Sequence, residues 1–215
     1  DGVGQAALTL NLQSFVQPDT GGAGASTFTV TGAQALTIAG DSTSQLTGSA
    51  DQDNLLGIVT ANSATALTLT SSGSATTNAA AFTTAAISAT GANTITLTSG
   101  AFDDFDITGN ITAAAAVETA NINVGTDSQM TLADLIMTGS ALLSSTITLG
   151  DGAFLSNSNA NVAIVAAESV DIVATSIADF NVTLGAGAIA ALDVQGVAMT
   201  DADFTVGASA NLVLG

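Results

Sequence analysis

Asn181–Val194, NVTLGAGAIAALDV, contains the pattern that most of this chain repeats. Val182 and Leu184 alternate with polar residues, Gly185 follows, and a second apolar set begins at Ile189. Alternation with a period of two predicts a β-strand with one buried face, and a glycine at its end predicts a tight corner or a positive φ. We interpret the stretch as one rung of a repetitive β-structure.

Short alternating strands that end in glycine recur over the second half of the chain. The best-matched examples place glycine at positions 100, 125, 150, 185 and 207, so the intervals are 25, 25, 35 and 22 residues. Irregular spacing of this kind favours stacked coils over a strict short repeat. The sequence therefore predicts an all-β fold, a parallel β-solenoid (β-helix) of about seven to nine irregular coils with two or three short strands each.

An antiparallel β-sandwich or jelly roll with a donated N-terminal strand is the alternative fold. Short strands at intervals of about 8–12 residues are expected of this fold too. The hairpin dipeptide Asn-Gly is missing, however, and Pro18 is the only proline of the chain. The weak period of the glycines favours the solenoid.

A glycine-rich segment that begins at Gly21 separates residues 1–20 from the rest of the chain. Leu8, Leu10 and Leu12 alternate with polar residues, which predicts a strand. This strand is either the first strand of the domain or an arm that is donated to the sheet of a neighbouring copy. Residues 21–215 are expected to form a single β-rich domain.

Composition excludes several functions. The chain has no Lys, Arg, His, Cys, Trp or Tyr, and its 18 acidic residues give a formal net charge of −18. Nucleic-acid binding needs cations that face phosphates, so nucleic acid is excluded as a partner. No apolar run reaches the ~18 residues that a membrane span needs. Zinc, haem and iron–sulfur centres lack their usual ligands, and we expect no enzyme activity, no catalytic residue and no required cofactor.

We expect the protein to be extracellular. The first residue is Asp1 rather than Met, which we interpret as a mature N-terminus after removal of a leader. A chain without Lys or Arg has no cleavage site for trypsin-like proteases, and without Cys it is chemically inert. Its hydrophobic share of 47% is too high for an acidic disordered chain.

Three segments share a low-complexity pattern of threonine, small apolar residues and glycine, namely TITLTSG (94–100), TITLGDGAF (146–154) and NVTLGAGA (181–188). In this pattern, most of residues 26–215 resembles the β-repeat regions of secreted bacterial surface-layer proteins and of large exoproteins exported by type I secretion. The resemblance implies an extracellular, assembling, non-enzymatic protein, often stabilised by calcium. The calcium-binding nonapeptide pattern occurs once, with Ser26 where the Asp ligand belongs, so a repeated calcium β-roll is not expected.

Closely spaced carboxylates are the only candidate metal ligands. Calcium binds several oxygens, which acidic loops can provide. Asp103, Asp104 and Asp106 form the first candidate site, Asp51 and Asp53 the second, and the pair at 201 and 203 a third. The alternative is a solvated loop whose charge keeps the protein soluble. Paired carboxylates also occur in glycosidases, but a chain without Trp or Tyr lacks the aromatic platforms of their substrate grooves.

Self-assembly is the function that the two chain ends suggest. The sequence ends in a strand, ASANLVLG, without a polar cap, and open solenoid ends pair with other strands. Copies of the chain are therefore the expected partner, joined head to tail into a pilus-like filament. The predicted interface consists of Leu8, Leu10, Leu12, Phe15, Leu212 and Leu214.

Two other functions remain open from the sequence. One is a surface-layer or adhesin module. The other is an ice-binding solenoid, because threonine-rich strands at Leu67–Thr70, Thr94–Thr98 and Thr146–Thr148 could form a flat array. Against ice binding, no strict T-x-T column repeats at one period.

Overall fold

The computed structural model describes residues 7–12, 27–41, 54–72, 81–113, 117–137, 141–156, 170–173, 176–195 and 198–215. Every regular element in these ranges is a β-strand. The strands are β1 (Ala7–Leu12), β2 (Thr27–Thr29), β3 (Ala35–Asp41), β4 (Asn54–Leu56), β5 (Ile58–Thr60), β6 (Ala66–Ser72), β7 (Ala81–Thr84), β8 (Ile87–Ser88), β9 (Thr94–Ser99), β10 (Asp104–Ile107), β11 (Ile111–Ala113), β12 (Thr119–Val124), β13 (Gln129–Leu132), β14 (Asp134–Met137), β15 (Ala141–Leu149), β16 (Phe154–Ser156), β17 (Val170–Val173), β18 (Ser176–Leu184), β19 (Ile189–Gln195), β20 (Ala198–Val206) and β21 (Asn211–Leu214).

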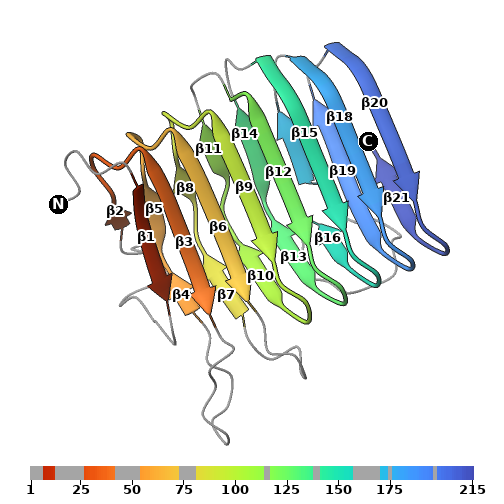
Figure 1. Ribbon diagram of the computed structural model, residues 1–215, viewed down its shortest axis with the longest axis horizontal. Helices are drawn as coiled ribbons and strands as arrows, with labels where there is room; N and C mark the ends of the chain where they lie inside the picture. Colours follow the sequence, from red (N-terminus) through yellow and green to blue (C-terminus); the bar gives the residue numbers. More distant parts are fainter. Residues whose placement is uncertain are drawn as a thin grey trace, which may run out of the picture.

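The strands stack into parallel sheets that wind as a solenoid (Figure 1). One sheet has eight strands in the order β1-β3-β6-β9-β12-β15-β18-β20. The other has thirteen, and its two arms meet at β19, which pairs with β16 through its first residues and with β17 through its last. Each full coil therefore contributes one strand to the eight-stranded sheet and one to each arm of the other.

All strand pairs within the described ranges are parallel, which confirms the predicted β-solenoid; the antiparallel sandwich is wrong. The described residues complete about six turns, somewhat fewer than the seven to nine coils expected. The coils differ in length. Ser145 pairs with Phe180, 35 residues later, whereas Phe180 pairs with Ala202, only 22 residues later. The longest coil carries its extra residues between β16 and β17, so the register of the strands is unaffected.

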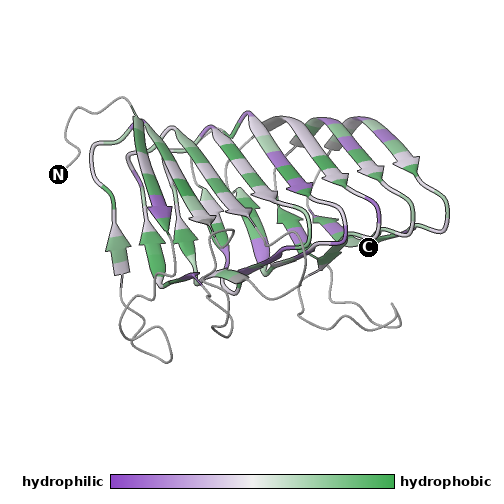
Figure 2. Ribbon diagram, turned by 60° about the horizontal axis from the view of Figure 1, so that its bottom comes forward, coloured by the Kyte–Doolittle hydropathy of each residue, from purple (hydrophilic) through white to green (hydrophobic). Residues whose placement is uncertain are grey.

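Buried apolar side chains form one core that runs through the coils. Hydrophobic and polar residues alternate along the strands that enclose it (Figure 2). Along the eight-stranded sheet, Leu69, Leu97, Ile122 and Ile147 follow one another in register and are at most 1% exposed. Alternation along each strand directs these residues inward and their polar neighbours outward. Burial of matched apolar residues thus holds each coil against the next.

Aromatic rings also stack from coil to coil. The rings of Phe82 and Phe105 lie parallel, with centroids 5.2 Å apart, in the adjacent strands β7 and β10. Phe180 meets Phe204 edge to face at 6.1 Å. Both geometries are favourable for aromatic pairs.

The glycines that follow the strands of the eight-stranded sheet form a column at one corner of the solenoid. A Cβ atom on Gly185 would lie 2.6 Å from the carbonyl carbon of Gly150, and one on Gly207 would lie 2.7 Å from that of Gly185. A Cβ on Gly125 would collide with the carbonyl oxygen of Gly100. Of the two roles predicted for these glycines, a tight corner and a positive φ, the structure shows the tight corner: the backbones approach too closely for a Cβ atom.

Positive φ occurs two residues after these glycines, in the same corner turn. The turn residues with positive φ are Phe102, Asp127, Gly152, Gly187 and Ser209. In the later coils the turn closes with a backbone hydrogen bond to the glycine carbonyl, as from Ala153 to Gly150 at 3.2 Å. The corner is thus a repeated turn that begins with a tightly packed glycine and contains one left-handed residue.

β1 pairs in parallel with β3 of the same chain over its full length, from Ala7 opposite Ala35 to Leu12 opposite Gly40. This is the arrangement expected of a first strand of the domain. Donation of this strand to a neighbouring copy, and the domain division after residue 20, stay predictions.

The corner column predicts a specific loss of stability. Gly125→Ala should lower the free energy of unfolding by about 2 kcal/mol, because a Cβ cannot fit without moving the backbone of the preceding coil. Urea unfolding followed by circular dichroism measures this. Ala101→Ser, at an exposed position of the same corner, is the control and should unfold like the parent. Equal stability of Gly125→Ala and the parent would contradict the packing argument.

Candidate functional site

The last coil forms one open end of the solenoid. β20 pairs with β18 and is the edge strand of the eight-stranded sheet, while β21 pairs with β19. Within the described part of the chain, no further strand covers β20. An edge strand of this kind presents unpaired backbone N–H and C=O groups.

Apolar side chains are exposed at the same end. Among the described residues, the large hydrophobic side chains with the greatest exposure all lie in β20 and β21: Met199 (41%), Phe204 (43%), Val206 (48%), Val213 (37%) and Leu214 (49%). Phe204 and Val206 stand opposite Val182 and Leu184, which are only 1% and 2% exposed. The two residues therefore continue interior columns and are exposed because, among the described residues, no strand covers β20.

β1 forms the opposite edge of the eight-stranded sheet, at the far end of the solenoid (Figure 1). Leu12 is buried, whereas Leu8 and Leu10 are only partly buried against the core. These leucines begin the columns that Phe204 and Val206 end: strand by strand, the register runs from Leu10 to Phe204 and from Leu12 to Val206. The two edges therefore present matching rows of apolar side chains.

The structure places most of the predicted interface residues at these edges. Leu8, Leu10 and Leu12 lie in β1, and Leu212 and Leu214 lie in β21. Phe15 is outside the described residues. Sequence reasoning missed Met199, Phe204, Val206 and Val213. The segment FTV before Gly207 repeats the strand-glycine pattern and could have marked the last coil.

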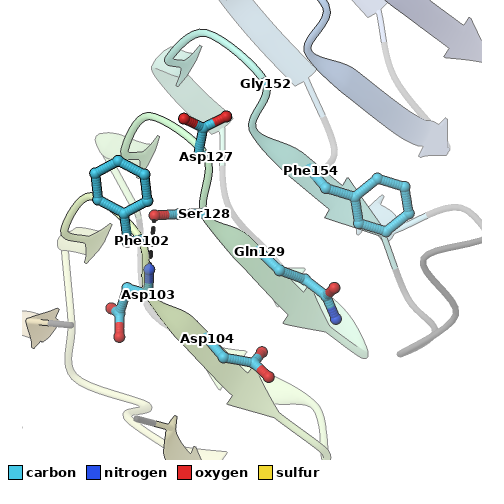
Figure 3. A pocket seen from close by; sticks show the side chains of 8 residues that line it. All are labelled: Phe102, Asp103, Asp104, Asp127, Ser128, Gln129, Gly152 and Phe154. Atoms are coloured by element: carbon cyan, nitrogen blue, oxygen red, sulfur yellow. Dashed lines mark hydrogen bonds between the residues drawn. The ribbon is translucent and has the colours of Figure 1, made fainter. Parts of the chain in front are cut away.

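The predicted calcium ligands at 103–106 do not gather around one point. Asp103 is 3% exposed and points to the inside of the corner, whereas Asp104 and Gln129 lie side by side on the outer surface (Figure 3). Asp106 is two residues beyond Asp104 and so shares its side of the strand. Within the described ranges no group of three or more acidic side chains could hold a metal ion. Asp51 and Asp53 are outside those ranges.

A pocket of about 320 Å³ lies over this corner (Figure 3). Its lining includes Asp103, Asp104, Asp127, Ser128, Gln129 and Phe154. Its polar lining consists of carboxylate, amide and hydroxyl groups.

Asp103 occupies a position where the following coils have small residues. Backbone bonding places Ser128 above it and Ala153 above Ser128, and the N–H of Asp103 donates to Ser128 Oγ at 3.0 Å. Among the described residues, no hydrogen bond of good geometry reaches either carboxylate oxygen of Asp103. Burial raises the pKa of Asp103 to about 6, and the nearby Ser71 hydroxyl offsets only part of this rise.

Three other aspartates form a ladder that the sequence did not reveal. Asp134, Asp171 and Asp193 stand opposite one another in β14, β17 and β19. Gln195 Nε2 donates to Asp171 at 3.0 Å and to Asp193 at 2.9 Å. Burial, and then the negative charges of Asp134 and Asp193, raise the pKa of Asp171. The ladder brings together residues that lie far apart in the chain, so no local motif marks it.

No family model, no curated protein and no solved structure shows significant similarity to this chain. In the described ranges, no helix has the length and apolar character that crossing a membrane requires.

Asp103 predicts how stability changes with pH. Its pKa is raised from 3.8 to about 6 on folding, so the folded state holds a proton that the unfolded state releases. Stability from this group is complete below pH ~4 and is lost as pH rises through 6. Asp103→Asn should therefore stabilise the protein at pH 7, by up to about 3 kcal/mol.

The measurement is the free energy of unfolding of both proteins from pH 4 to pH 8. The difference between them should grow across this range. Asp127→Asn is the control, because it removes one charge from the exposed side of the same pocket and keeps a residue that tolerates positive φ. A difference independent of pH would contradict a buried, ionising Asp103.

Proposed function

We propose that the protein is an extracellular structural subunit that assembles head to tail, with the β20 edge of one copy pairing to the β1 edge of the next. The observation that carries the proposal is the concentration of exposed large apolar side chains on the last coil. Exposed apolar surface beside unpaired strand edges is a typical protein-interaction surface. A second copy covers both at once.

The register inside one chain predicts the register between copies. If the columns continue, Ala202, Phe204 and Val206 of one copy lie opposite Leu8, Leu10 and Leu12 of the next. On the outer surface, Thr205 then lies opposite Asn11, and Asp203 lies opposite Thr9. Asp203 therefore lies opposite an uncharged residue, so no carboxylates repel one another across these two pairs.

Contact between two different edges of the same molecule leaves a free edge at each end of the product. Such heterologous contacts produce open filaments unless the rotation closes a ring. The net charge of −18 keeps the sides of such filaments apart. In a surface layer, such filaments would also associate side by side, whereas in a pilus-like fibre they would not. Electron microscopy distinguishes the two forms.

Engineered cysteines test the register. The chain has no cysteine of its own, so Asn11→Cys with Thr205→Cys introduces one defined pair. Adjacent strands lie about 4.8 Å apart, within the Cα separation that a disulfide spans. Oxidation should give a ladder of covalent oligomers on a non-reducing gel. β1 and β20 lie at opposite ends of one copy, so cross-links form only between copies (Figure 1).

The matched control for the cross-link is Thr9→Cys with Thr205→Cys. This pair is displaced by two residues along the strand, which places the Cα atoms about 8 Å apart, beyond disulfide reach. Cross-linking of both pairs to the same extent would contradict the proposed register. Filaments without any cross-link at the in-register pair would contradict the β1–β20 junction.

Phe204 tests assembly itself. Phe204→Asp should abolish filaments in negative-stain images and give a monomer in sedimentation velocity, because a charge would have to be buried at the junction. Thr148→Asp, on the outer surface of the interior strand β15, adds the same charge and should leave filaments intact. A parent protein that stays monomeric at all concentrations would overturn the proposed function.

A further inference from the structure

Threonine and asparagine make up most of two columns on the outer surface of the eight-stranded sheet. The columns, two residues apart along every strand, run through the whole sheet. In order from β1 to β20, the first column is Thr9, Thr37, Thr68, Thr96, Asn121, Thr146, Asn181 and Asp203, and the second is Asn11, Ala39, Thr70, Thr98, Asn123, Thr148, Thr183 and Thr205. We call these two columns the Thr/Asn array.

Stacking, rather than a fixed sequence period, creates the array. Thr68 and Thr96 are 28 residues apart, whereas Thr146 and Asn181 are 35 residues apart, yet both pairs are in register. No T-x-T column repeats at one period along the sequence, as predicted. Stacking nevertheless aligns the T-x-T segments of β6, β9 and β15 on one surface, because strands from coils of unequal length stack in register. The unequal coil lengths are absorbed on other sides of the solenoid.

The backbone fixes the spacing of the array in both directions. Members of one column are about 4.8 Å apart, and the two columns are separated by about 6.7 Å along the strands. The strands lie side by side with little twist (Figure 1). The inward residues between the columns, such as Leu69, Leu97 and Ile147, are fully buried, so the strands that carry the array are held rigidly.

The chemistry of the array excludes most ligands. The only charged member of the two columns is Asp203, at the last strand. Beside the first column, Asp179 and Asp201 are the outward residues of β18 and β20, so acidic groups gather at one end of the array. Anions find no cation in this chain, and sugar rings find no aromatic residue in the array. A ligand for this surface must be flat, uncharged, periodic and able to exchange hydrogen bonds with hydroxyl and amide groups.

We propose that the Thr/Asn array binds the surface of ice. Water oxygens in hexagonal ice repeat at distances close to the two spacings of the array, so hydroxyl and amide groups on this grid can hold water in an ice-like order. The threonine methyl groups lie beside the hydroxyls and add apolar contact with the same layer. The inference does not depend on assembly, because one copy already carries the complete array.

Thermal hysteresis and adsorption to single ice crystals test the proposal. The monomeric Phe204→Asp protein is used, so that filament formation does not enter the result. We expect hysteresis and binding to defined crystal planes. Thr96→Lys, which places a long charged side chain in the centre of the array, should lose both while keeping the circular dichroism of the parent.

Thr112→Lys is the matched control. Thr112 is also a half-exposed threonine, in β11 on a different side of the solenoid, and its replacement should leave hysteresis unchanged. Absence of both hysteresis and ice adsorption in the protein with the intact array would overturn the proposal. So would an equal loss in Thr96→Lys and Thr112→Lys. If Phe204→Asp still forms filaments, the assembly proposal fails and the ice measurement remains decisive.

Discussion

In-register hydrogen bonding between parallel strands is the constraint on which the rest of this structure depends. Each strand must lie directly above its predecessor at about 4.8 Å, so every side chain has a fixed neighbour in the next coil. Columns of like residues follow: leucine and isoleucine inside, threonine and asparagine outside, glycine at the corner. The corner shows how strict the constraint is, because the backbone of Gly185 approaches Gly150 too closely for a Cβ atom.

The same constraint forces some residues into unfavourable places. Asp103 stands in a corner column whose next members are Ser128 and Ala153, and it is buried without a well-aligned hydrogen bond. Asp171 is held between two other aspartates of its ladder. Burial raises the pKa of Asp103, and burial together with the charges of Asp134 and Asp193 raises the pKa of Asp171. The strand register, which interior packing maintains, therefore places these carboxyl groups where their ionised form is disfavoured.

A solenoid built in this way does not close on itself. Its interior columns end at Leu10 on one side and at Phe204 on the other, and each end presents unpaired backbone groups beside apolar side chains. The proposed junction satisfies both ends with the interactions that already join the coils within one chain. The outer surface is independent of the ends, so assembly and surface binding can be separated by substitution.

The sequence by itself determined the strand pattern and the glycine corners, because these depend on local alternation and composition. It also located Leu8, Leu10, Leu12, Leu212 and Leu214, since an apolar strand near a chain end is visible as a pattern. Only the tertiary structure decided which residues share a column. Coils of 22 to 35 residues stack in register, so neither the Thr/Asn array nor the aspartate ladder has a fixed sequence period. Likewise, Asp103 and Asp104 are neighbours in the chain, but their side chains point in different directions: Asp103 is buried in the corner, whereas Asp104 lies beside Gln129.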